Sequence, residues 1–509
     1  MQKSILCYVV SGIMLVIILG GERVYTEALL TDLYQVTMMQ GLFFEGKGEQ
    51  QCVFDRYYRT NPFGGAYTVV AGLEHLIEFV QNLQFTDDDI AYLKSTGFFM
   101  DEFLHHLKTF HFTGDIYAMP EGTVAFPQEV LLRVHAKKNE AILLETALSM
   151  IMNHESLLAT KARRTRVVAG DDMLMEFGLR RAQGKSAAVY GARATIIGGF
   201  DATSNLLSGA KFNVPVVGTM AHSWVMSFSN ELDAFRAYVR QFPNNLILLV
   251  DTYNTLQQGV PNAIEVFKEM KAAGTLPKKY GIRLDSGDLT YLSKEARELL
   301  RQAGFGDAVI AASNDLDEHL ISELKRQGAE ISSWGVGTNL ITAEGSPALG
   351  GVYKLAGQYE DNRFVPKIKL SDNVEKISNP GIKNVVRIID KKSGKMKGDI
   401  IVLNEESISV DKDFEFVNDI APWRRRLVKA RTFEAHTLLK PIFINGKLVY
   451  KRPTMDQICT YADQEILRLW PEYLRLVNPE CMWVQRSHKL NELRSKLLKK
   501  ERENFLARG

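Results

Sequence analysis

Short polar segments follow seven apolar stretches in the middle of the chain, and they contain the residue types that bind phosphates and sugars. In parallel α/β folds ligands bind at the carboxyl ends of strands, so segments of this kind would meet at one edge of a sheet. Their Arg, Asp, Ser, Thr and Gly content suits a phosphorylated sugar as the ligand. The segments are residues 176–181, 203–205, 218–223, 251–253, 283–288, 313–315 and 335–338.

Each segment offers a specific contact. Backbone N–H groups of Gly337 and Thr338 are placed to meet a phosphate at a helix start, and Asp285 and Asp288 have the oxygens to hold ribose hydroxyls or Mg²⁺. Arginines pair with phosphate or carboxylate. The arginines concerned are Arg180, Arg181 and Arg283.

Every one of these features also has a purely structural interpretation. The GVGT sequence is a common glycine-rich turn, RLDSGD is compatible with a helix N-cap, and a lone histidine such as His222 is usually a core residue. The arginine pair at 180–181 is compatible with a solvated surface. Seven such segments at successive strand ends are hard to explain as caps, and together they favour a site.

Strand and helix patterns alternate between residues 159 and 355, as expected for parallel strands with crossover helices. We expect an irregular α/β barrel, closed or nearly closed, with an open doubly wound sheet as the alternative. The predicted strands are 173–178, 214–218, 246–251, 280–285, 308–312 and 331–335. The predicted helices are 186–197 with Ser186 as N-cap, 231–242, 261–273, 289–303 and 316–327.

The flanking regions have other patterns. Before the alternation, Thr86 and the acids at 87–89 predict a helix start, Gly97 its end, and residues 114–134 read as short strands. After it, strands are expected at 382–389 and 400–410, a basic turn at 391–397 and a terminal helix at 487–506. The predicted division is an apolar segment 1–26, an α/β domain 27–155, the barrel 156–358 with the site, and a region 359–509 packing back on the N-terminal domain.

Composition narrows the class of protein. The 509 residues are 46% hydrophobic and 24% charged, which excludes wholesale disorder and fibrous architecture. A net charge of +2 gives no reason to expect nucleic acid as a partner. Four scattered cysteines are too few for a disulfide framework or a zinc site. The body of the chain therefore reads as a soluble, reduced-compartment enzyme.

The N-terminus differs from this body. Residues 5–19 form an apolar run broken only by Ser11 and Gly12. As a helix it would span about 23 Å, short of the roughly 30 Å hydrocarbon core. A signal-peptide core, a signal anchor and an upstream extension of a cytosolic protein remain as interpretations.

At these motifs the sequence resembles the nicotinate phosphoribosyltransferase family. The resemblance covers all but about the first 25 residues, and it is specific because the motifs occur together. It implies a type II phosphoribosyltransferase fold, usually a homodimer. It also implies a reaction of nicotinate with 5-phosphoribosyl 1-diphosphate, giving nicotinate mononucleotide and diphosphate, coupled to ATP hydrolysis and assisted by Mg²⁺ or Mn²⁺. The motifs are TDLYQVTM (31–38), FGLRRAQG (177–184), GTMAHS (218–223), LVDTYNT (249–255), GIRLDSGDL (281–289), and GVGT (335–338) followed by GVYKL (351–355).

The resemblance assigns roles residue by residue. Tyr34 matches the residue that stacks on the nicotinate ring, Thr219 and Arg283 its other contacts, and His222 the histidine that ATP phosphorylates. Asp285 and Asp288 are expected to act near the ribose. The expected contacts of the phosphoribosyl substrate are Arg180, Ser313, Asn314, Gly337 and Thr338.

Three alternatives stay open at this stage. A nicotinamide-specific relative differs by base preference, and Arg283 favours the acid. Quinolinate phosphoribosyltransferase shares the fold but uses no ATP, and the histidine of GTMAHS argues against it. The third is a non-catalytic, membrane-tethered barrel, supported only by the apolar N-terminus. Since ATP and phosphoribosyl diphosphate are cytosolic metabolites, we expect a cytosolic enzyme.

Overall fold

The computed structural model describes residues 5–10, 13–18, 24–373, 376–417 and 423–506. Within the N-terminal apolar run, β1 (Ile5–Val10) and β2 (Ile13–Ile18) pair antiparallel, so this run contains strands rather than the helix considered above. None of the helices in these ranges combines the length and apolar character needed to cross a membrane.

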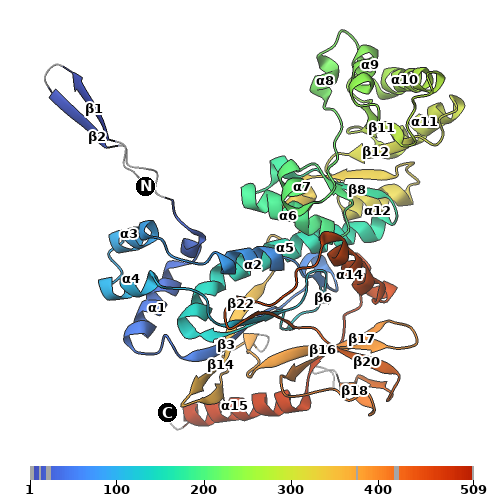
Figure 1. Ribbon diagram of the computed structural model, residues 1–509. Coiled ribbons are helices and arrows are strands. Elements are labelled where there is room, and N and C mark those ends of the chain that lie inside the picture. The colour runs from blue at the N-terminus through green and yellow to red at the C-terminus, as the bar shows by residue number, and fades with distance from the viewer. Residues whose placement is uncertain (1–4, 11–12, 19–23, 374–375, 418–422, 507–509) are drawn as a thin grey trace.

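The N-terminal part of the chain folds around a seven-stranded sheet in the order β15-β14-β3-β7-β5-β21-β22 (Figure 1). Its strands come from three distant stretches of sequence, and β3 pairs antiparallel with both β7 and β14. They are β3 (Gln51–Tyr58), β5 (Asp115–Ala118), β7 (Leu132–Lys137), β14 (Gly351–Glu360), β15 (Arg363–Pro366), β21 (Lys440–Ile444) and β22 (Lys447–Leu448).

Helices and a small ribbon complete this part. The predicted helix start at Thr86 is confirmed, because Thr86 and Asp89 form a reciprocal capping box at the start of α3. The 32-residue α5 is largely buried and carries the chain from the N-terminal sheet to the parallel one. The elements are α1 (Leu33–Phe44), α2 (Leu73–Gln81), α3 (Asp87–Ser95), α4 (Asp101–Leu107), α5 (Lys138–Ala169), and the paired β4 (Thr68–Val69) and β6 (Val124–Ala125).

The middle of the chain forms the predicted parallel sheet, with six strands in the order β10-β11-β12-β13-β8-β9. It is a half barrel, since β10 and β9 stand at opposite edges, and the α/β barrel of parallel strands is thereby confirmed in its irregular, incompletely closed form. The strands are β8 (Met173–Glu176), β9 (Ala202–Thr203), β10 (Leu246–Leu249), β11 (Tyr280–Leu284), β12 (Val309–Ser313) and β13 (Ser333–Val336).

The crossover helices lie close to their predicted positions, with two local corrections. The helix expected from Ser186 begins at Lys185 and is preceded by Gly184 at φ +108°, a conformation that favours glycine over serine. The strand expected at 214–218 is reduced to a single bridge between Val216 and Thr203. The helices are α6 (Lys185–Ile197), α7 (Leu206–Phe212), α8 (His222–Met226), α9 (Glu231–Gln241), α10 (Val260–Ala272), α11 (Leu289–Gln302), α12 (Glu318–Arg326) and α13 (Thr338–Ile341).

The C-terminal region adds a four-stranded sheet, β20-β16-β17-β23, and a β18–β19 ribbon. The basic turn predicted at 391–397 joins β16 to β17, whereas the strand expected at 400–410 ends at Leu403. Leu490 of α15 is fully buried against β17 residues. The elements are β16 (Lys383–Asp390), β17 (Met396–Leu403), β18 (Phe414–Val417), β19 (Arg425–Val428), β20 (Phe433–Thr437), β23 (Val484–Arg486), α14 (Met455–Leu467) and α15 (His488–Leu506).

A buried arginine joins this region to the N-terminal part. The Arg387 guanidinium pairs with Asp399 at 2.6 Å and with Glu465 of α14, and it donates to the Val124 carbonyl at 2.6 Å. Two carboxylates offset the desolvation of one cation, and its pKa is raised as a result. This contact and the β5–β21 pairing both connect residues beyond 380 to those before 130.

Candidate active site

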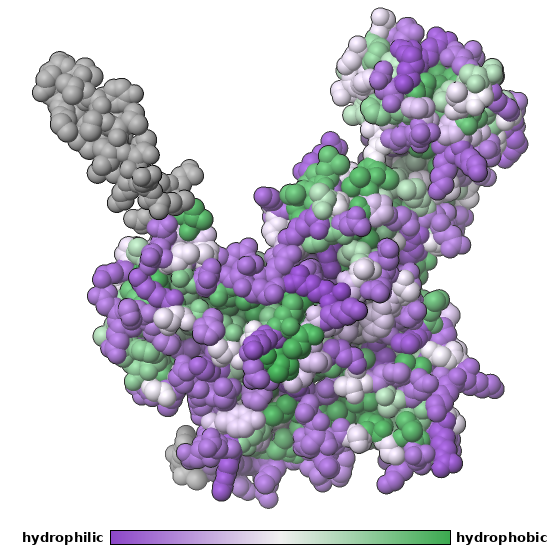
Figure 2. Space-filling model, in the orientation of Figure 1, coloured by the Kyte–Doolittle hydropathy of each residue, from purple (hydrophilic) through white to green (hydrophobic). Residues whose placement is uncertain are grey.

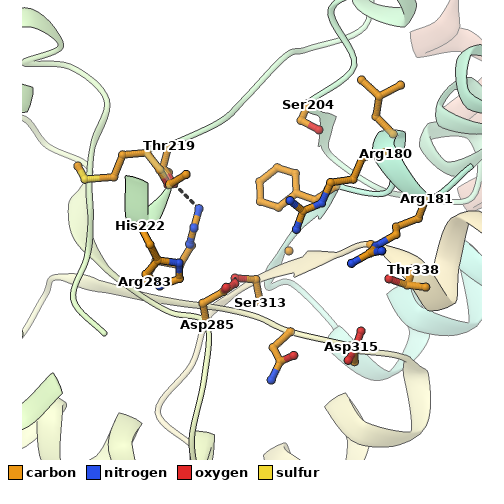
Figure 3. A pocket seen from close by; sticks show the side chains of 17 residues that line it. Arg180, Arg181, Ser204, Thr219, His222, Arg283, Asp285, Ser313, Asp315 and Thr338 are labelled. Carbon is orange, nitrogen blue, oxygen red and sulfur yellow. Dashed lines mark hydrogen bonds between the residues drawn. The ribbon is translucent and has the colours of Figure 1, made fainter. Parts of the chain in front are cut away.

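A cavity of about 580 Å³ opens at the carboxyl ends of the parallel strands (Figure 3). Two arginines extend into it from one side, a threonine, a histidine and an arginine lie on the other, and polar residues after β11 and β12 lie between them. The lining residues are Phe177, Leu179, Arg180, Arg181, Ser204, Thr219, Met220, Ala221, His222, Arg283, Asp285, Ser313, Asn314, Asp315, Gly335, Gly337 and Thr338.

The arginine side is fixed by a buried carboxylate at the end of β8. Glu176 accepts hydrogen bonds from the Gly178 backbone N–H and from the Thr203 hydroxyl, and burial raises its pKa. These bonds hold the turn that carries Arg180 and Arg181, which are both exposed. No ion pair among the described residues involves either guanidinium, and both line the cavity, so both are available to an anionic ligand.

The opposite side is built on Arg283, which lies on β11. Its Nη1 donates to the Thr219 hydroxyl, whereas its buried Nε has no hydrogen-bond partner within the described ranges. Burial lowers the pKa of Arg283, and the neighbouring Asp285 and Asp251 carboxylates act against that shift. One nitrogen of the guanidinium is therefore held by Thr219, while the edge that lines the cavity is open to an acidic group.

His222 is the first residue of α8 and contacts a carboxylate that follows β10. Its Nε2 lies 3.2 Å from Asp251 Oδ1, and the side chains are 40% and 1% exposed respectively. Asp251 Oδ2 accepts hydrogen bonds from the Asp285 backbone N–H at 2.8 Å and from the Ser286 hydroxyl at 2.7 Å. The histidine thus faces the cavity while a buried, fully bonded carboxylate orients its ring.

The floor of the cavity is the turn after β12. The Ser313 hydroxyl donates to Asp285 Oδ1, and this bond joins the turns that follow two neighbouring strands. Asn314 and Asp315 have φ values of +108° and +41°. Asn339 donates to the Asp315 carbonyl at 2.8 Å, and this contact helps to hold the strained turn.

The GVGT segment passes from β13 into α13 with little space beside it. A Cβ at Gly335 would lie 2.7 Å from the Phe177 ring, and one at Gly337 would lie 3.2 Å from the Phe177 carbonyl oxygen. Thr338 begins α13 at the cavity wall. The close approach of β13 to the Phe177 turn explains why glycine stands at both positions.

The structure gathers most of the predicted site residues in this one cavity and leaves out two. Asp288 caps α11 by accepting a hydrogen bond from the Tyr291 backbone N–H at 3.0 Å, which agrees with the N-cap interpretation of RLDSGD. It is not among the residues that line the cavity. Tyr34 lies on α1 in the N-terminal part, 51% exposed and outside the cavity of its own chain.

Sequence reasoning did not select Asp251, Asp315 and Phe177 as site residues. Asp251 and Asp315 stand in polar segments after predicted strands, and this position was the signal that could have identified them as site residues. Nothing in the sequence shows which carboxylate contacts the histidine. Phe177 belongs to the FGLRR motif, and its contact with Gly335 depends on the spacing of β8 and β13.

The fold and the cavity define an α/β enzyme whose site has the charges to hold a phosphorylated substrate. The chain belongs to the nicotinate phosphoribosyltransferase family. Three family models cover most of it: the nicotinate phosphoribosyltransferase N-terminal domain at residues 29–153, the nicotinate phosphoribosyltransferase family at 173–356, and the nicotinate phosphoribosyltransferase C-terminal domain at 382–494.

Individual relatives agree with this assignment. The nicotinate phosphoribosyltransferase of Bacillus subtilis is 43% identical over 479 residues, 92% of this chain and 96% of that protein. The one of Dictyostelium discoideum is 37% identical over 89% of this chain and 85% of its own. The crystal structure of human nicotinic acid phosphoribosyltransferase superposes with a TM-score of 0.80 at 30% identity, covering 92% of this chain and 99% of that one.

The packing of Gly335 against Phe177 gives a first testable prediction. Gly335→Ala should push the Phe177 ring and the arginine turn away from β13, since the new Cβ would lie 2.7 Å from that ring. We expect a loss of about 1–3 kcal/mol in the free energy of unfolding and a clear rise in the KM of the phosphorylated substrate. Gly350→Ala is the matched control, because nothing lies within 4 Å of a Cβ there. Equal behaviour of the two variants in denaturant titration and kinetics would contradict this account.

Proposed function

We propose that this enzyme joins nicotinate to 5-phosphoribosyl 1-diphosphate, giving nicotinate mononucleotide and diphosphate, and couples the reaction to ATP hydrolysis through phosphorylated His222. One observation carries the proposal: a single cavity contains, on one side, arginines that no carboxylate within the described ranges pairs with and, on the other, a histidine oriented by a buried carboxylate beside Arg283. We place this activity in the cytosol, where ATP and the sugar diphosphate are made.

Arg283 is proposed to bind the nicotinate carboxylate. Its Nη1 is occupied by Thr219 and the guanidinium lines the cavity, so a carboxylate can bind its open edge. The amide group of nicotinamide has one acceptor oxygen and no charge, so Arg283 binds nicotinate more strongly than nicotinamide. The ring nitrogen of nicotinate is already nucleophilic, so the transfer needs no general base.

The phosphoribosyl substrate is proposed to span the cavity floor. Arg180, Arg181 and the start of α13 at Gly337 and Thr338 supply donors for its phosphate groups. As the nicotinate nitrogen forms its bond to the anomeric carbon, the carbon–oxygen bond to diphosphate breaks and diphosphate leaves with that electron pair. Cationic side chains that meet this developing charge lower the barrier.

The carboxylate side of the floor is proposed to support the ribose. Asp285 lines the cavity and accepts a hydrogen bond from the Ser313 hydroxyl. Asn314, the residue after Ser313, also lines the cavity. The Asp288 carboxylate is used as a helix cap, so we propose Asp285 alone of the two for this role. A carboxylate here stabilises the positive charge that develops on the sugar in the transition state.

A divalent cation fits the same part of the cavity. The described residues contain no group of three or more His, Cys, Asp or Glu that could hold a metal ion alone. Mg²⁺, or Mn²⁺ in its place, usually takes one or two carboxylates and completes its shell with water and substrate phosphates. Asp285 and Asp315 are the residues that would hold it, and bound there it would neutralise charge on the diphosphate.

The contact with Asp251 supports Nδ1 as the proposed acceptor of the phosphoryl group on His222. Because Asp251 Oδ2 is occupied by two donors, Oδ1 accepts the Nε2–H of the ring, which leaves the Nδ1 lone pair to attack the γ-phosphorus of ATP. The phosphorus–oxygen bond breaks and ADP leaves. Later transfer of the phosphoryl group to water completes ATP hydrolysis.

Tyr34 is exposed and lies outside the cavity of its own chain, so its proposed contact with nicotinate is explained if a second copy brings it. We propose a homodimer in which the α1 surface of one chain covers the barrel mouth of the other. Exposed apolar side chains on both surfaces support this: Leu33, Tyr34 and Met38 on α1, and Leu206, 74% exposed, and Leu207 on α7. Figure 2 shows hydrophobic surface near α6 and α7.

Product analysis tests the activity itself. Nicotinate, nicotinamide and quinolinate are each incubated with phosphoribosyl diphosphate, with and without ATP. The proposal expects nicotinate mononucleotide from nicotinate and a clear gain with ATP. A preference for nicotinamide or quinolinate, or no turnover with any base, would favour one of the alternatives named above.

The open edge of Arg283 predicts a specific change in base preference. Arg283→Ala should raise the KM for nicotinate and narrow its preference over nicotinamide, because a charge-assisted hydrogen bond of about 1.5–3 kcal/mol is lost. The control is Arg301→Ala, which removes an exposed arginine paired with Glu298 on α11. An unchanged ratio of kcat/KM for acid and amide would remove Arg283 from the base site.

The orientation of His222 predicts the site and isomer of phosphorylation. With γ-labelled ATP, acid-labile and base-stable label should appear on His222 as the Nδ1 isomer, which chromatography of an alkaline digest separates from the Nε2 isomer. His222→Asn should lose ATP coupling and retain slow transfer, whereas His436→Asn, at an exposed histidine paired with Glu434, should behave as wild type. Label on another residue, or ATP coupling in His222→Asn, would refute the assignment.

The position of Tyr34 predicts that the two copies complement each other. A mixed dimer with one Tyr34→Ala chain and one Arg283→Ala chain, purified through two tags, contains one intact site if each site uses Tyr34 of the other chain. It should then show about half of wild-type activity at low nicotinate. If both residues of a site come from the same chain, the mixed dimer will have no intact site and will match the mean of its parents.

A further inference from the structure

We propose that Ser286 is a positioning residue that makes phosphorylation of His222 effective, although it touches neither the histidine nor the cavity. This inference rests on the proposed role of His222. Ser286 follows β11, in the loop before α11, and its hydroxyl donates to Asp251 Oδ2 at 2.7 Å.

The buried carboxylate depends on this loop for its orientation. Asp251 is 1% exposed, and its Oδ2 accepts from the Asp285 backbone N–H at 2.8 Å as well as from Ser286. The backbone donor is present whatever residue stands at 285. Among the described residues, Ser286 provides the side-chain donor to Asp251 Oδ2. Its hydrogen bond therefore fixes which carboxylate oxygen faces His222 Nε2, at 3.2 Å.

The 285–286 loop also forms a hydrogen bond with the neighbouring strand β12. Asp285 accepts a hydrogen bond from the Ser313 hydroxyl, and Ser313 precedes the strained Asn314 turn on the cavity floor. A continuous set of hydrogen bonds thus runs from His222 through Asp251 and the 285–286 loop to Ser313. It crosses three neighbouring parallel strands, β10, β11 and β12.

Phosphorylation makes the position of Asp251 critical. A phosphoryl group on the ring places negative charge close to the Asp251 carboxylate, and like charges at short range repel. Two donors on Oδ2 hold the carboxylate against this repulsion and leave Oδ1 bonded to Nε2–H. With one donor removed, Asp251 can turn away, which weakens the orientation of the His222 ring.

The test compares Ser286→Ala with Ser286→Thr, which keeps the hydroxyl. In Ser286→Ala we expect phosphohistidine to form roughly tenfold more slowly, the size expected for loss of one hydrogen bond to a charged group. We also expect more ATP hydrolysed per product formed, and an unchanged kcat for transfer without ATP. Ser286→Thr should restore the phosphorylation rate and the stoichiometry.

The control removes a hydroxyl nearby that has another partner. Thr290 lies in the first turn of α11 and donates to Gln327, so Thr290→Ala should leave both measurements unchanged. Equal phosphorylation rates in Ser286→Ala and wild type would overturn the inference. So would a parallel loss of transfer without ATP, because that outcome indicates a general structural role. Absence of phosphohistidine in the wild-type enzyme would instead refute the proposed function, and the two failures are therefore distinguishable.

Discussion

The parallel pairing of β10, β11, β12, β13 and β8 is the constraint on which the site depends. Since neighbouring strands run in the same direction and in register, the residues that follow them emerge at one edge, whatever their distance in the sequence. Arg180, which follows β8, and Asp285, which follows β11, are brought to one cavity in this way. The sheet sets the spacing, and the loops only have to supply the side chains.

Hydrogen bonds between adjacent loops then convert this spacing into a defined geometry. Ser313 bonds Asp285, the 285–286 loop bonds Asp251, and Thr219 bonds Arg283. Each bond joins two segments that are distant in the sequence, so the polar groups that line the cavity are held by the protein itself. Preorganised groups of this kind spend less free energy on reorganisation when charge develops.

The sequence was a good guide to these strands and a poorer guide to individual side chains. The apolar run at 246–251 and the helix patterns after it predicted the parallel sheet, because strands buried on both faces leave a clear signal. The prediction of a strand at 214–218 was wrong. The apolar residues of this segment do not reveal that only Val216 pairs with a neighbouring strand.

The limits at the site have the same physical origin. Asp288 and Asp285 lie three residues apart, and only the path of the loop decides which one caps a helix and which one enters the cavity. Likewise, the sequence shows that Asp251 follows a strand but not that its carboxylate meets His222. Tyr34 was selected from a motif, and a motif does not show that α1 lies outside the cavity of its own chain.

The seven-stranded sheet has a consequence for the synthesis of the chain. Strand β3 emerges from the ribosome early, but its neighbour β14 begins at Gly351 and the partner of β5 begins at Lys440. At ordinary elongation rates tens of seconds separate these strands. During that interval one edge of β3 and one edge of β5 present unpaired backbone groups, which are prone to pair with other chains. This sheet is therefore a part of the nascent chain that needs protection, and it is completed only after β21 and β22 have been translated.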